Sequence, residues 1–497
     1  MTGPDSLAIA AIDLGASSGR VVAGHRSPER LTMRLVHRFA NVPVRAAGLL
    51  QWDVLALFRG MLDGLRLAEA AIGPLDSVGV NGWGVDYGLL DGNGQLLGNP
   101  AHYRDGRTGP AYSAAVGTLG AAGLYDATGT ALHQFNTVFQ LLTDRASGRL
   151  AVASSALLVP DLMTYWLCGA AGTELTNAST TGLLDARTRD WSAAVASRLE
   201  LPPGLFPPIR WPGQVAGTMR PDVAADAGLR SLPQVITVPS HDTAAAVAGI
   251  PAGPGRFAYV CTGTWALVGL ELPEPVITPA SRAANFTNEV GADGAIRFLR
   301  NVTGFWLLQE CMRDWRAQGQ SADVDELTRA AGAVPPLRAL IDVQAKELAA
   351  PGDMPRRIVQ ACLRTSGVAL TTPAEITRCI LDSMAIAIRR ALRDALLLSD
   401  TAVDVVHVVG GAAANAPFCQ LIADACQLPV LAGPTEAATW GNATYQAKAL
   451  GANSGSPAAA RAIIRQAEPP ASYSVRGADA DWQRASELVL EGRGVRA

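Results

Sequence analysis

The chain carries the stretch Asp13-Leu14-Gly15-Ala16-Ser17-Ser18-Gly19-Arg20 close to its start. The apolar run Leu7–Ile12 leads into this stretch and Val21–Ala23 leads out of it, which predicts two strands joined by a tight turn. Small residues leave backbone N–H groups and hydroxyls free to face an anion and let a phosphate approach closely. The stretch is therefore interpreted as a phosphate-binding hairpin, with an ordinary Gly-Ser turn as the alternative. Asp13, at the end of the first strand, is a candidate Mg²⁺ ligand, directly or through water.

A second hairpin of the same kind opens the second half of the chain. Residues 257–261 and 265–268 have the apolar character of strands, and Thr262-Gly263-Thr264 forms a small-residue turn between them. Each hairpin lies near the start of its own half of the sequence. The pair predicts a duplicated α/β unit, with two lobes that clamp a nucleotide between them.

Length and composition limit the class of protein. A chain of 497 residues is too long for one core, and 49% hydrophobic with 17% charged residues is typical of a globular protein. The net charge of −3 gives no reason to expect nucleic acid or a membrane as a partner. We expect no signal peptide, because residues 1–6 lack a basic start and an apolar core, and no apolar run reaches the length of a membrane span.

The seven cysteines are scattered and form no C-x-x-C motif, which favours reduced thiols in a cytoplasmic protein. Cys362 and Cys379 would pair only if the fold brought them together, and buried free thiols are the preferred expectation. Motifs that are missing also matter: the chain has no G-x-x-x-x-G-K-[ST], no H-R-D and no D-F-G. The P-loop and protein-kinase routes to phosphoryl transfer are therefore excluded, and a nucleotide site would use amides, hydroxyls and metal.

Further strands and helices follow from local patterns. Residues 77–80 and 235–238 are expected to be strands, residues 53–71 a helix, and residues 156–160 a short strand or turn before a helix. Residues 403–409 read as a buried strand that ends at Gly410-Gly411, with a helix beginning near residues 415–417. A glycine pair after a parallel strand lets a flat ring or a ribose lie against the backbone, although a plain strand–helix turn remains the alternative.

Asp242 is the candidate catalytic base. It follows the predicted strand at 235–238, and strand ends at a cleft are where α/β enzymes place reactive groups. A carboxylate there can accept the proton of an attacking hydroxyl. The alternative is that Asp242 is the N-cap of the Ala-rich helix that follows. His241 is either a sugar ligand or structural, and the segments 83–86 and 103–107 suit either polyol recognition or ordinary surface loops.

These motifs resemble the FGGY carbohydrate kinases from about Ala8 to about Leu450. The resemblance rests on seven motifs in one order: residues 13–20, 83–86, 240–243, 262–265, Asn301 with 306–309, 410–411 and 436–442. It implies an α/β fold of two actin-like (ribonuclease H-like) ATPase domains with a nucleotide and sugar cleft between them. The domains expected are 1–249 (sugar and first phosphate loop) and 250–455 (second phosphate loop and adenosine), with 456–497 as a peripheral tail.

The resemblance also implies a reaction and a set of roles. The expected activity is ATP- and Mg²⁺-dependent phosphorylation of L-rhamnulose at its 1-hydroxyl, in L-rhamnose catabolism. Another ketose, such as L-fuculose or a pentulose, is the alternative substrate, and an actin-like ATPase without sugar transfer is the remote alternative. A monomer is expected, with a dimer as the alternative. The implied site residues are Asp242 as general base; Ala16, Ser17, Ser18, Gly19, Arg20, Thr264, Gln309 and Gly411 for ATP; and Gly84, His241, Asp242, Thr243 and Asn301 for the sugar.

Three residues depart from the pattern that the resemblance implies. Asn81-Gly82 stands before Trp83 where Asp-Thr is expected for this ketose, so the identity of the sugar rests on this neighbourhood. Trp440 stands where the late glycine motif usually has an aliphatic residue.

Overall fold

The computed structural model describes residues 6–27, 30–452 and 456–494. Residues 1–5, on which most of the signal-peptide expectation rests, lie outside the described residues. The strands are β1(Leu7–Leu14), β2(Ser18–Arg26), β3(Leu31–Ala40), β4(Val44–Ala46), β5(Leu49–Gln51), β6(Ser77–Gly82), β7(Tyr87–Leu90), β8(Ser155–Leu158), β9(Thr173–Glu174), β10(Leu184–Asp185), β11(Asp190–Trp191), β12(Ile209–Arg210), β13(Gln214–Thr218), β14(Gln234–Thr237), β15(Phe257–Thr262), β16(Trp265–Leu272), β17(Thr287–Val290), β18(Ile296–Thr303), β19(Val405–Val409), β20(Val430–Ala432) and β21(Ala471–Tyr473).

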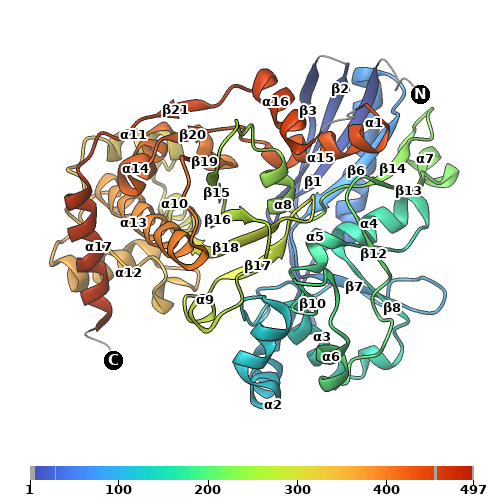
Figure 1. The fold of residues 1–497 in the computed structure, drawn as a ribbon, viewed down its shortest axis with the longest axis horizontal. Coiled ribbons are helices and arrows are strands. Elements are labelled where there is room, and N and C mark those ends of the chain that lie inside the picture. The colour runs from blue at the N-terminus through green and yellow to red at the C-terminus, as the bar shows by residue number, and fades with distance from the viewer. Residues whose placement is uncertain (1–5, 28–29, 453–455, 495–497) are drawn as a thin grey trace. The chain divides into compact units, whose positions relative to one another are not determined.

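The helices complete the fold (Figure 1). The α-helices are α1(Val54–Ile72), α2(Gly109–Thr128), α3(Thr137–Ala146), α4(Val159–Cys168), α5(Leu175–Ala178), α6(Ala193–Arg198), α7(Pro221–Ala227), α8(Asp242–Ala248), α9(Pro279–Ala283), α10(Trp306–Ala317), α11(Val324–Ala331), α12(Met354–Ser366), α13(Pro373–Ser399), α14(Ala416–Cys426), α15(Ala437–Ala449), α16(Pro457–Ala467) and α17(Asp479–Gly494). Short 3₁₀ helices are η1(Gly106–Thr108), η2(Arg149–Ala151), η3(Lys346–Leu348) and η4(Gly411–Ala414).

The chain forms two compact units. Unit 1 comprises Met1–Gly253, Glu271–Phe298 and Ala437–Glu468, and unit 2 comprises Pro254–Leu270, Leu299–Glu436 and Pro469–Ala497. These units do not follow the predicted boundary near Gly249, which stays a prediction. The segment expected to be a tail supplies α16 to unit 1, and β21 and α17 to unit 2.

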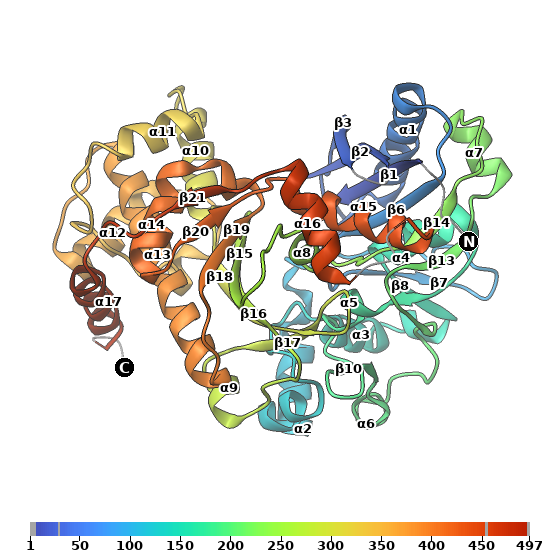
Figure 2. The ribbon, with the colours of Figure 1, turned by 45° about the horizontal axis from the view of Figure 1, so that its top comes forward.

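The sheet of unit 1 has the order β13-β14-β6-β1-β2-β3. β1 pairs antiparallel with β2 and parallel with β6, and β6 pairs parallel with β14. The alternation of side chains along β1 explains why this strand is buried on both faces. Ile12 packs with helices α1 and α4, whereas Ile9 packs with α15 and α16. Figure 2 shows α1 and α15 on opposite sides of the blue strands, so segments from both ends of the chain cover one sheet.

The sheet that dominates unit 2 repeats this connectivity. Its order is β17-β18-β16-β15-β19-β20-β21, and the strands β16 and β18 each contribute residues to both units. β15 pairs antiparallel with β16 and parallel with β19, as β1 pairs with β2 and with β6. Both units thus begin with a hairpin whose first strand has a parallel neighbour. The prediction of a duplicated α/β unit is confirmed.

Helix α8 crosses α15 at very short range because two glycines lie at the crossing. A Cβ on Gly441 would overlap the carbonyl oxygen of Ala245, and a Cβ on Gly249 would overlap that of Ala437. Trp440, the departure in the late motif, is 4% exposed and packs into the apolar cluster beside β1. The late glycine motif therefore fixes the position of α8 against unit 1's sheet.

The local predictions of strands and helices are confirmed for the two hairpins, for β6, β14 and β19, and for the helices α1, α4 and α14. Asp53 caps α1 by accepting a hydrogen bond from Ala56 N at 3.0 Å, which explains where this helix begins. All seven cysteines carry free thiols, and Cys362 and Cys379 are both buried, on α12 and α13. Over the ranges that the structure describes, no helix combines the length and apolar character needed to cross a membrane.

Candidate active site

Three parallel strands of unit 1 end at one edge of its sheet. Trp83 N donates to Leu14 O at 3.2 Å, and Gly82 N donates to Ser240 O at 2.9 Å. The segments that follow β1, β6 and β14 are therefore neighbours in space, although they are far apart in the sequence. The carboxyl ends of parallel strands are where α/β folds hold ligands. This edge unites the first phosphate turn, the segment from Trp83 and the candidate base.

The turn after β1 is braced from outside by Asn41. The side chain of Asn41 donates to Gly15 O at 2.9 Å, its backbone N donates to Ser17 O at 3.1 Å, and Gly15 N donates to Ser18 O at 3.0 Å. The backbone N–H groups of Ala16 and Ser17 donate no hydrogen bond to any described residue. A rigid turn with open amides is the geometry that a phosphate requires.

Asp13 is 5% exposed and both of its oxygens are engaged. Asn81 Nδ2 donates to Oδ1 at 2.6 Å, and Arg20 Nε lies 3.2 Å from Oδ2. Within the described ranges, no group of three or more His, Cys, Asp or Glu could hold a metal ion. Mg²⁺ in nucleotide sites commonly takes one or two protein carboxylates together with phosphate oxygens and water. Asp13 therefore fits a magnesium that is held mainly by the nucleotide.

The departure at Asn81-Gly82 belongs to the same strand end. Asn81 lies between Asp13 and Asn442, whose Nδ2 donates to Asn81 Oδ1 at 2.7 Å. A Cβ on Gly82 would lie 2.9 Å from Leu14 O, so a larger residue there would push β6 away from β1. The two residues build a buried polar network at the edge of the sheet, and both are fully enclosed by protein.

The second turn is held by residues of unit 2. Gly263 N donates to Trp265 O at 2.8 Å, and Gly304 N donates to Thr264 O at 3.2 Å. A Cβ on Gly304 would lie 2.6 Å from the backbone of Trp265, so only glycine lets β18 end so close to the turn. Thr264 Oγ1 donates to Gln309 Oε1 at 3.3 Å. The structure thus brings together two residues that the sequence predicts for ATP.

The Gly410-Gly411 pair follows β19, next to the second hairpin. Gly410 has φ +84°, and a Cβ on it would lie 2.7 Å from Thr262 O. Both the backbone angle and the lack of space therefore require glycine at this position. Gly411 is exposed, and a Cβ on it would meet nothing within 4 Å. The backbone at Gly411 therefore offers open space of the kind that a flat base or ribose occupies.

Asp242 is the first residue of α8, and the N-cap of that helix is His241. The alternative that Asp242 is the N-cap is therefore wrong, because His241 has the extended backbone angles of a cap. The Oδ1 atom of Asp242 accepts hydrogen bonds from Thr243 N at 2.5 Å and from Thr243 Oγ1 at 3.1 Å. Oδ2 has no protein partner among the described residues, and the side chain is 35% exposed. One oxygen is thus anchored and the other is available.

His241 connects Asp242 to a buried ion pair. Arg297 Nη2 lies 3.0 Å from His241 Nδ1, and Arg297 pairs with Glu289 at 2.9 Å. His241 Nδ1 also lies 3.4 Å from Glu289 Oε2, and His241 Nε2 lies 3.4 Å from Asp242 Oδ1, so the ring bridges the ion pair and the candidate base. Burial opposes the charge of Glu289, but Arg297 and His241 outweigh it and keep the pKa of Glu289 below its usual value.

Glu174 fixes the main chain just before Asp242. Its carboxylate accepts hydrogen bonds from Ser240 N at 2.9 Å and Ser240 Oγ at 3.0 Å, and from Thr176 Oγ1 at 2.6 Å. Thr176 Oγ1 in turn accepts a hydrogen bond from His241 N at 3.3 Å. Glu174 is 1% exposed, and burial raises its pKa. The segment that carries the candidate base is therefore held by a buried carboxylate from a distant part of the chain.

The segment from Trp83 is organised by Asp86. This buried carboxylate accepts hydrogen bonds from Trp52 Nε1 at 2.6 Å, Trp83 Nε1 at 3.1 Å and Gln140 Nε2 at 2.8 Å. Burial raises the pKa of Asp86 to about 6. Gly84, the predicted sugar contact, is partly exposed, and a Cβ on it would lie 2.9 Å from Thr180 Oγ1. Asp86 therefore positions the indole rings and Gly84 and has no surface of its own for a sugar.

The other polar segment considered for polyol recognition, residues 103–107, is also largely committed to the protein. Arg107 pairs with Asp144 at 2.5 Å, and Asp105 accepts a hydrogen bond from Leu50 N at 2.8 Å. Tyr103 N donates to Asp86 at 3.1 Å. These contacts fix residues 103–107 within unit 1.

Asn301, on β18, carries an unsatisfied acceptor. Its Oδ1 atom is buried and has no hydrogen-bond partner among the described residues, while its backbone oxygen accepts from Gln344 Nε2 at 3.3 Å. A buried acceptor without a partner is costly, so a ligand hydroxyl is the natural partner.

Sequence reasoning missed Glu174, Glu289 and Arg297. Glu289 stands in a short strand with no neighbouring motif, and Glu174 lies 66 residues before Ser240. The available signal was weak, because Glu174 and Glu289 belong to none of the motifs recognised in the sequence.

Comparisons with known proteins agree with this geometry. Residues 8–249 match the N-terminal domain model, and residues 258–450 the C-terminal domain model, of the FGGY family of carbohydrate kinases. The chain belongs to the FGGY family of carbohydrate kinases, which are phosphotransferases. The resemblance seen in the sequence is confirmed, as is the two-domain kinase fold.

Relatives of known name are similar over most of their length. The chain is 37% identical to the rhamnulokinase of Bacteroides thetaiotaomicron, over 89% of this chain and 90% of that protein. It is 39% identical to the rhamnulokinase of Pectobacterium carotovorum, over 89% of this chain and 88% of that protein.

Solved structures show the same fold at low identity. The ligand-bound xylulose kinase of Lactobacillus acidophilus superimposes with a TM-score of 0.81 at 17% identity and 98% coverage of both chains. The glycerol kinase of Plasmodium falciparum with ADP gives a TM-score of 0.75 at 15% identity and 98% coverage of both chains.

Proposed function

We propose that this chain transfers the γ-phosphoryl group of ATP to the 1-hydroxyl of L-rhamnulose, in L-rhamnose catabolism. The observation that carries the chemistry is Asp242, whose Oδ1 is anchored by Thr243 and whose Oδ2 is available to a substrate. The similarity to rhamnulokinases over about nine-tenths of the chain supports the choice of sugar. We further propose a cytoplasmic monomer.

Asp242 accepts the proton of the attacking hydroxyl through Oδ2. General-base assistance of this kind contributes about a hundred- to ten-thousand-fold to a rate. His241 Nε2 lies 3.4 Å from Oδ1, the oxygen anchored by Thr243, which leaves Oδ2 as the proton acceptor. Thr176, which is itself held by Glu174, fixes the backbone of His241, and Arg297 holds its ring, so that the base meets the hydroxyl in a fixed orientation.

The remaining predicted residues bind and orient the substrates. The amides of Ala16 and Ser17 and the hydroxyl of Thr264 are assigned to phosphate oxygens, Gln309 and Gly411 to the rest of the nucleotide, and Ser18, Gly19 and Arg20 to the first phosphate turn. Gly84, His241, Asp242, Thr243 and Asn301 are assigned to the sugar. Asp13 would hold Mg²⁺, which when bound neutralises phosphate charge.

The test is an assay of ADP release with L-rhamnulose, L-fuculose, L-ribulose and D-xylulose at fixed ATP and Mg²⁺, with a blank that lacks sugar. The proposal expects the highest kcat/KM with L-rhamnulose. A higher kcat/KM with another ketose would contradict the proposed sugar and leave the family chemistry in place. A rate that does not depend on sugar would contradict the proposed transfer itself.

A further inference from the structure

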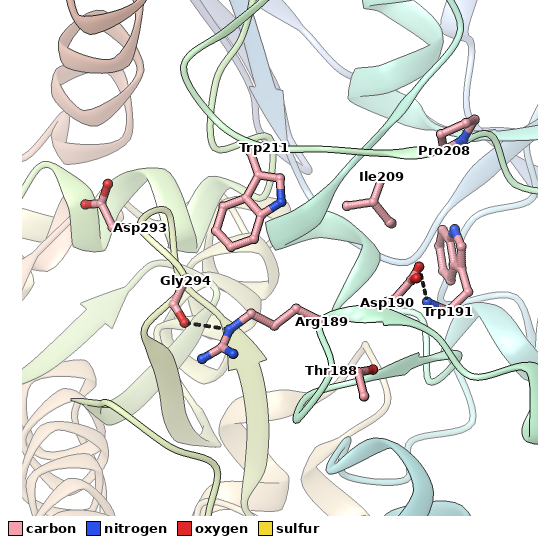
Figure 3. Close-up of a pocket in the computed structure, with 9 residues that line it drawn as sticks. All are labelled: Thr188, Arg189, Asp190, Trp191, Pro208, Ile209, Trp211, Asp293 and Gly294. Atoms are coloured by element: carbon pink, nitrogen blue, oxygen red, sulfur yellow. Dashed lines mark hydrogen bonds between the residues drawn. The ribbon is translucent and has the colours of Figure 1, made fainter.

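A pocket of about 640 Å³ opens on unit 1, and none of its lining residues belongs to the candidate active site. Figure 3 shows its walls, which come from β11 and the two residues before it, from β12 with the residues beside it, and from the turn between β17 and β18. It is lined by Thr188, Arg189, Asp190, Trp191, Pro208, Ile209, Trp211, Asp293 and Gly294. Its volume lies within the range of small-molecule sites.

Two tryptophans provide rigid apolar walls. Trp211 is 40% exposed, and a Cβ on Gly294 would lie 3.1 Å from its ring, so the indole rests against bare backbone. Trp191 stacks on Phe206 with ring centroids 4.7 Å apart and an interplanar angle of 21°. Figure 3 shows the two indoles on opposite sides of the pocket, with Ile209 between them. The rings are held in place before any ligand binds, which lowers the entropic cost of binding.

Polar groups of both charges lie beside these rings. Arg189 has φ +59°, an uncommon backbone conformation for an arginine, and its Nε donates to Gly294 O at 3.0 Å. Its two terminal nitrogens have no hydrogen-bond partner among the described residues. Asp190 accepts from Trp191 N at 2.8 Å through Oδ1 alone, and Asp293 is exposed and lies 3.0 Å from Lys448 Nζ. A fixed donor fork and two carboxylates thus line the same pocket.

We propose that this pocket binds a pyranose sugar, at a site separate from that of phosphoryl transfer. The indole faces match the apolar C–H face of a sugar ring, and an arginine beside carboxylates matches vicinal hydroxyls, which both accept and donate. Arg189 and Lys448 are balanced by Asp190 and Asp293, so the pocket has no excess positive charge, and phosphate and nucleotides are poor candidates. The inference does not depend on which ketose the enzyme phosphorylates.

The test uses saturation-transfer NMR with methyl α-L-rhamnopyranoside and methyl β-D-glucopyranoside. Neither glycoside is a ketose with a free 1-hydroxyl. We expect saturation transfer to the ring protons of at least one glycoside with the wild-type chain and equally with Asp242→Asn. We expect at least a fivefold loss of this signal with Trp211→Ala, while kcat/KM for the ketose is unchanged.

A second variant guards against misfolding of Trp211→Ala. Thr188→Trp fills the pocket from an exposed position and removes no described contact of the walls, so it should also abolish the signal. The proposal is overturned if neither glycoside receives saturation, if the signal survives both pocket variants, or if Asp242→Asn removes it. If adenosine receives saturation from the protein and displaces the glycoside, the choice of ligand is also overturned.

Discussion

Glu174 accepts hydrogen bonds from both the backbone N–H and the hydroxyl of Ser240, at 2.9 and 3.0 Å. The two residues are 66 positions apart, and Ser240 stands two residues before Asp242. A buried carboxylate thus fixes the start of the helix that carries the candidate base. The same contact therefore contributes to the stability of unit 1 and to the orientation of Asp242.

Replacing Glu174 by Gln should lower kcat by about ten- to a hundredfold, because an amide turns one donor group toward the donors of Ser240 and Thr176. A mismatch of this kind costs about 1–3 kcal/mol. The KM for ATP should not change, because Glu174 contacts no residue assigned to ATP. Steady-state kinetics with both substrates measures kcat and the KM for ATP separately.

Glu69→Gln is a matched control for this variant. Glu69 is also buried and accepts from Ser231 N at 3.1 Å and Ser231 Oγ at 2.6 Å, but it contacts no candidate site residue. It should lower the free energy of unfolding and leave kcat near the wild-type value. Equal kcat losses in the two variants would show that Glu174 has no positioning role.

Replacing Asp242 by Asn should reduce kcat by about a hundred- to ten-thousand-fold, since the amide accepts no proton. The variant should bind ATP with an unchanged Kd, measured by calorimetry, because Asp242 is assigned to the sugar side. Thr243→Val, which removes one hydrogen bond to Oδ1, serves as a milder comparison. Near-normal turnover by Asp242→Asn would exclude it as the base.

Asp86 should make the stability of the protein depend on pH. Burial raises its pKa to about 6 from the ordinary value of 3.8, so the folded state binds the proton more tightly than the unfolded state does. The contribution of Asp86 to stability is therefore complete at low pH and is lost as the pH rises through 6, by up to about 3 kcal/mol. Asp86→Asn lacks this dependence.

Urea unfolding of wild-type protein and of Asp86→Asn from pH 4 to pH 7 measures the effect. The variant should be the less stable protein, because its amide faces the indole donors of Trp52 and Trp83. The difference in the free energy of unfolding between the two proteins should shrink as the pH rises. A difference that grows with pH would show that the folded state favours the charged carboxylate.

Gly441→Ala should lower the free energy of unfolding by about 2–4 kcal/mol, because its methyl group would overlap the carbonyl oxygen of Ala245. It should also reduce kcat, because α8 begins with Asp242 and must move. Gly117→Ala is the control, since a Cβ on Gly117 meets nothing within 4 Å and α2 carries no candidate site residue. Chemical denaturation and kinetics of both variants test this expectation.

Asn301→Ala should raise the KM for the ketose by about tenfold or more and leave the KM for ATP unchanged. The reason is that the buried Oδ1 of Asn301 has no partner among the described residues, so a sugar hydroxyl would supply its hydrogen bond. Gln344→Ala removes the contact to the backbone of Asn301 and should have little effect. A change in the KM for ATP alone would instead assign Asn301 to the nucleotide site.

Much of the fold was predictable because its signals are local. The hairpin at residues 7–26 follows from apolar runs on either side of small residues, and both the strands and the turn are confirmed. The membership of the FGGY family likewise followed from short motifs in order, and the family models confirm it. The assignment of single residues to ATP or sugar stays a prediction.

The amino-acid sequence by itself determined the two hairpins, the strands β6, β14 and β19, the helices α1, α4 and α14, and the residue types at the ends of these strands, since these depend on neighbours along the chain. Only the tertiary structure decided that His241 and not Asp242 caps α8, that Glu174 holds Ser240, and that Arg297 and Glu289 enclose His241. Such partners are separated by tens of residues, and they meet because parallel strands bring their carboxyl ends to one edge and buried charges require partners there.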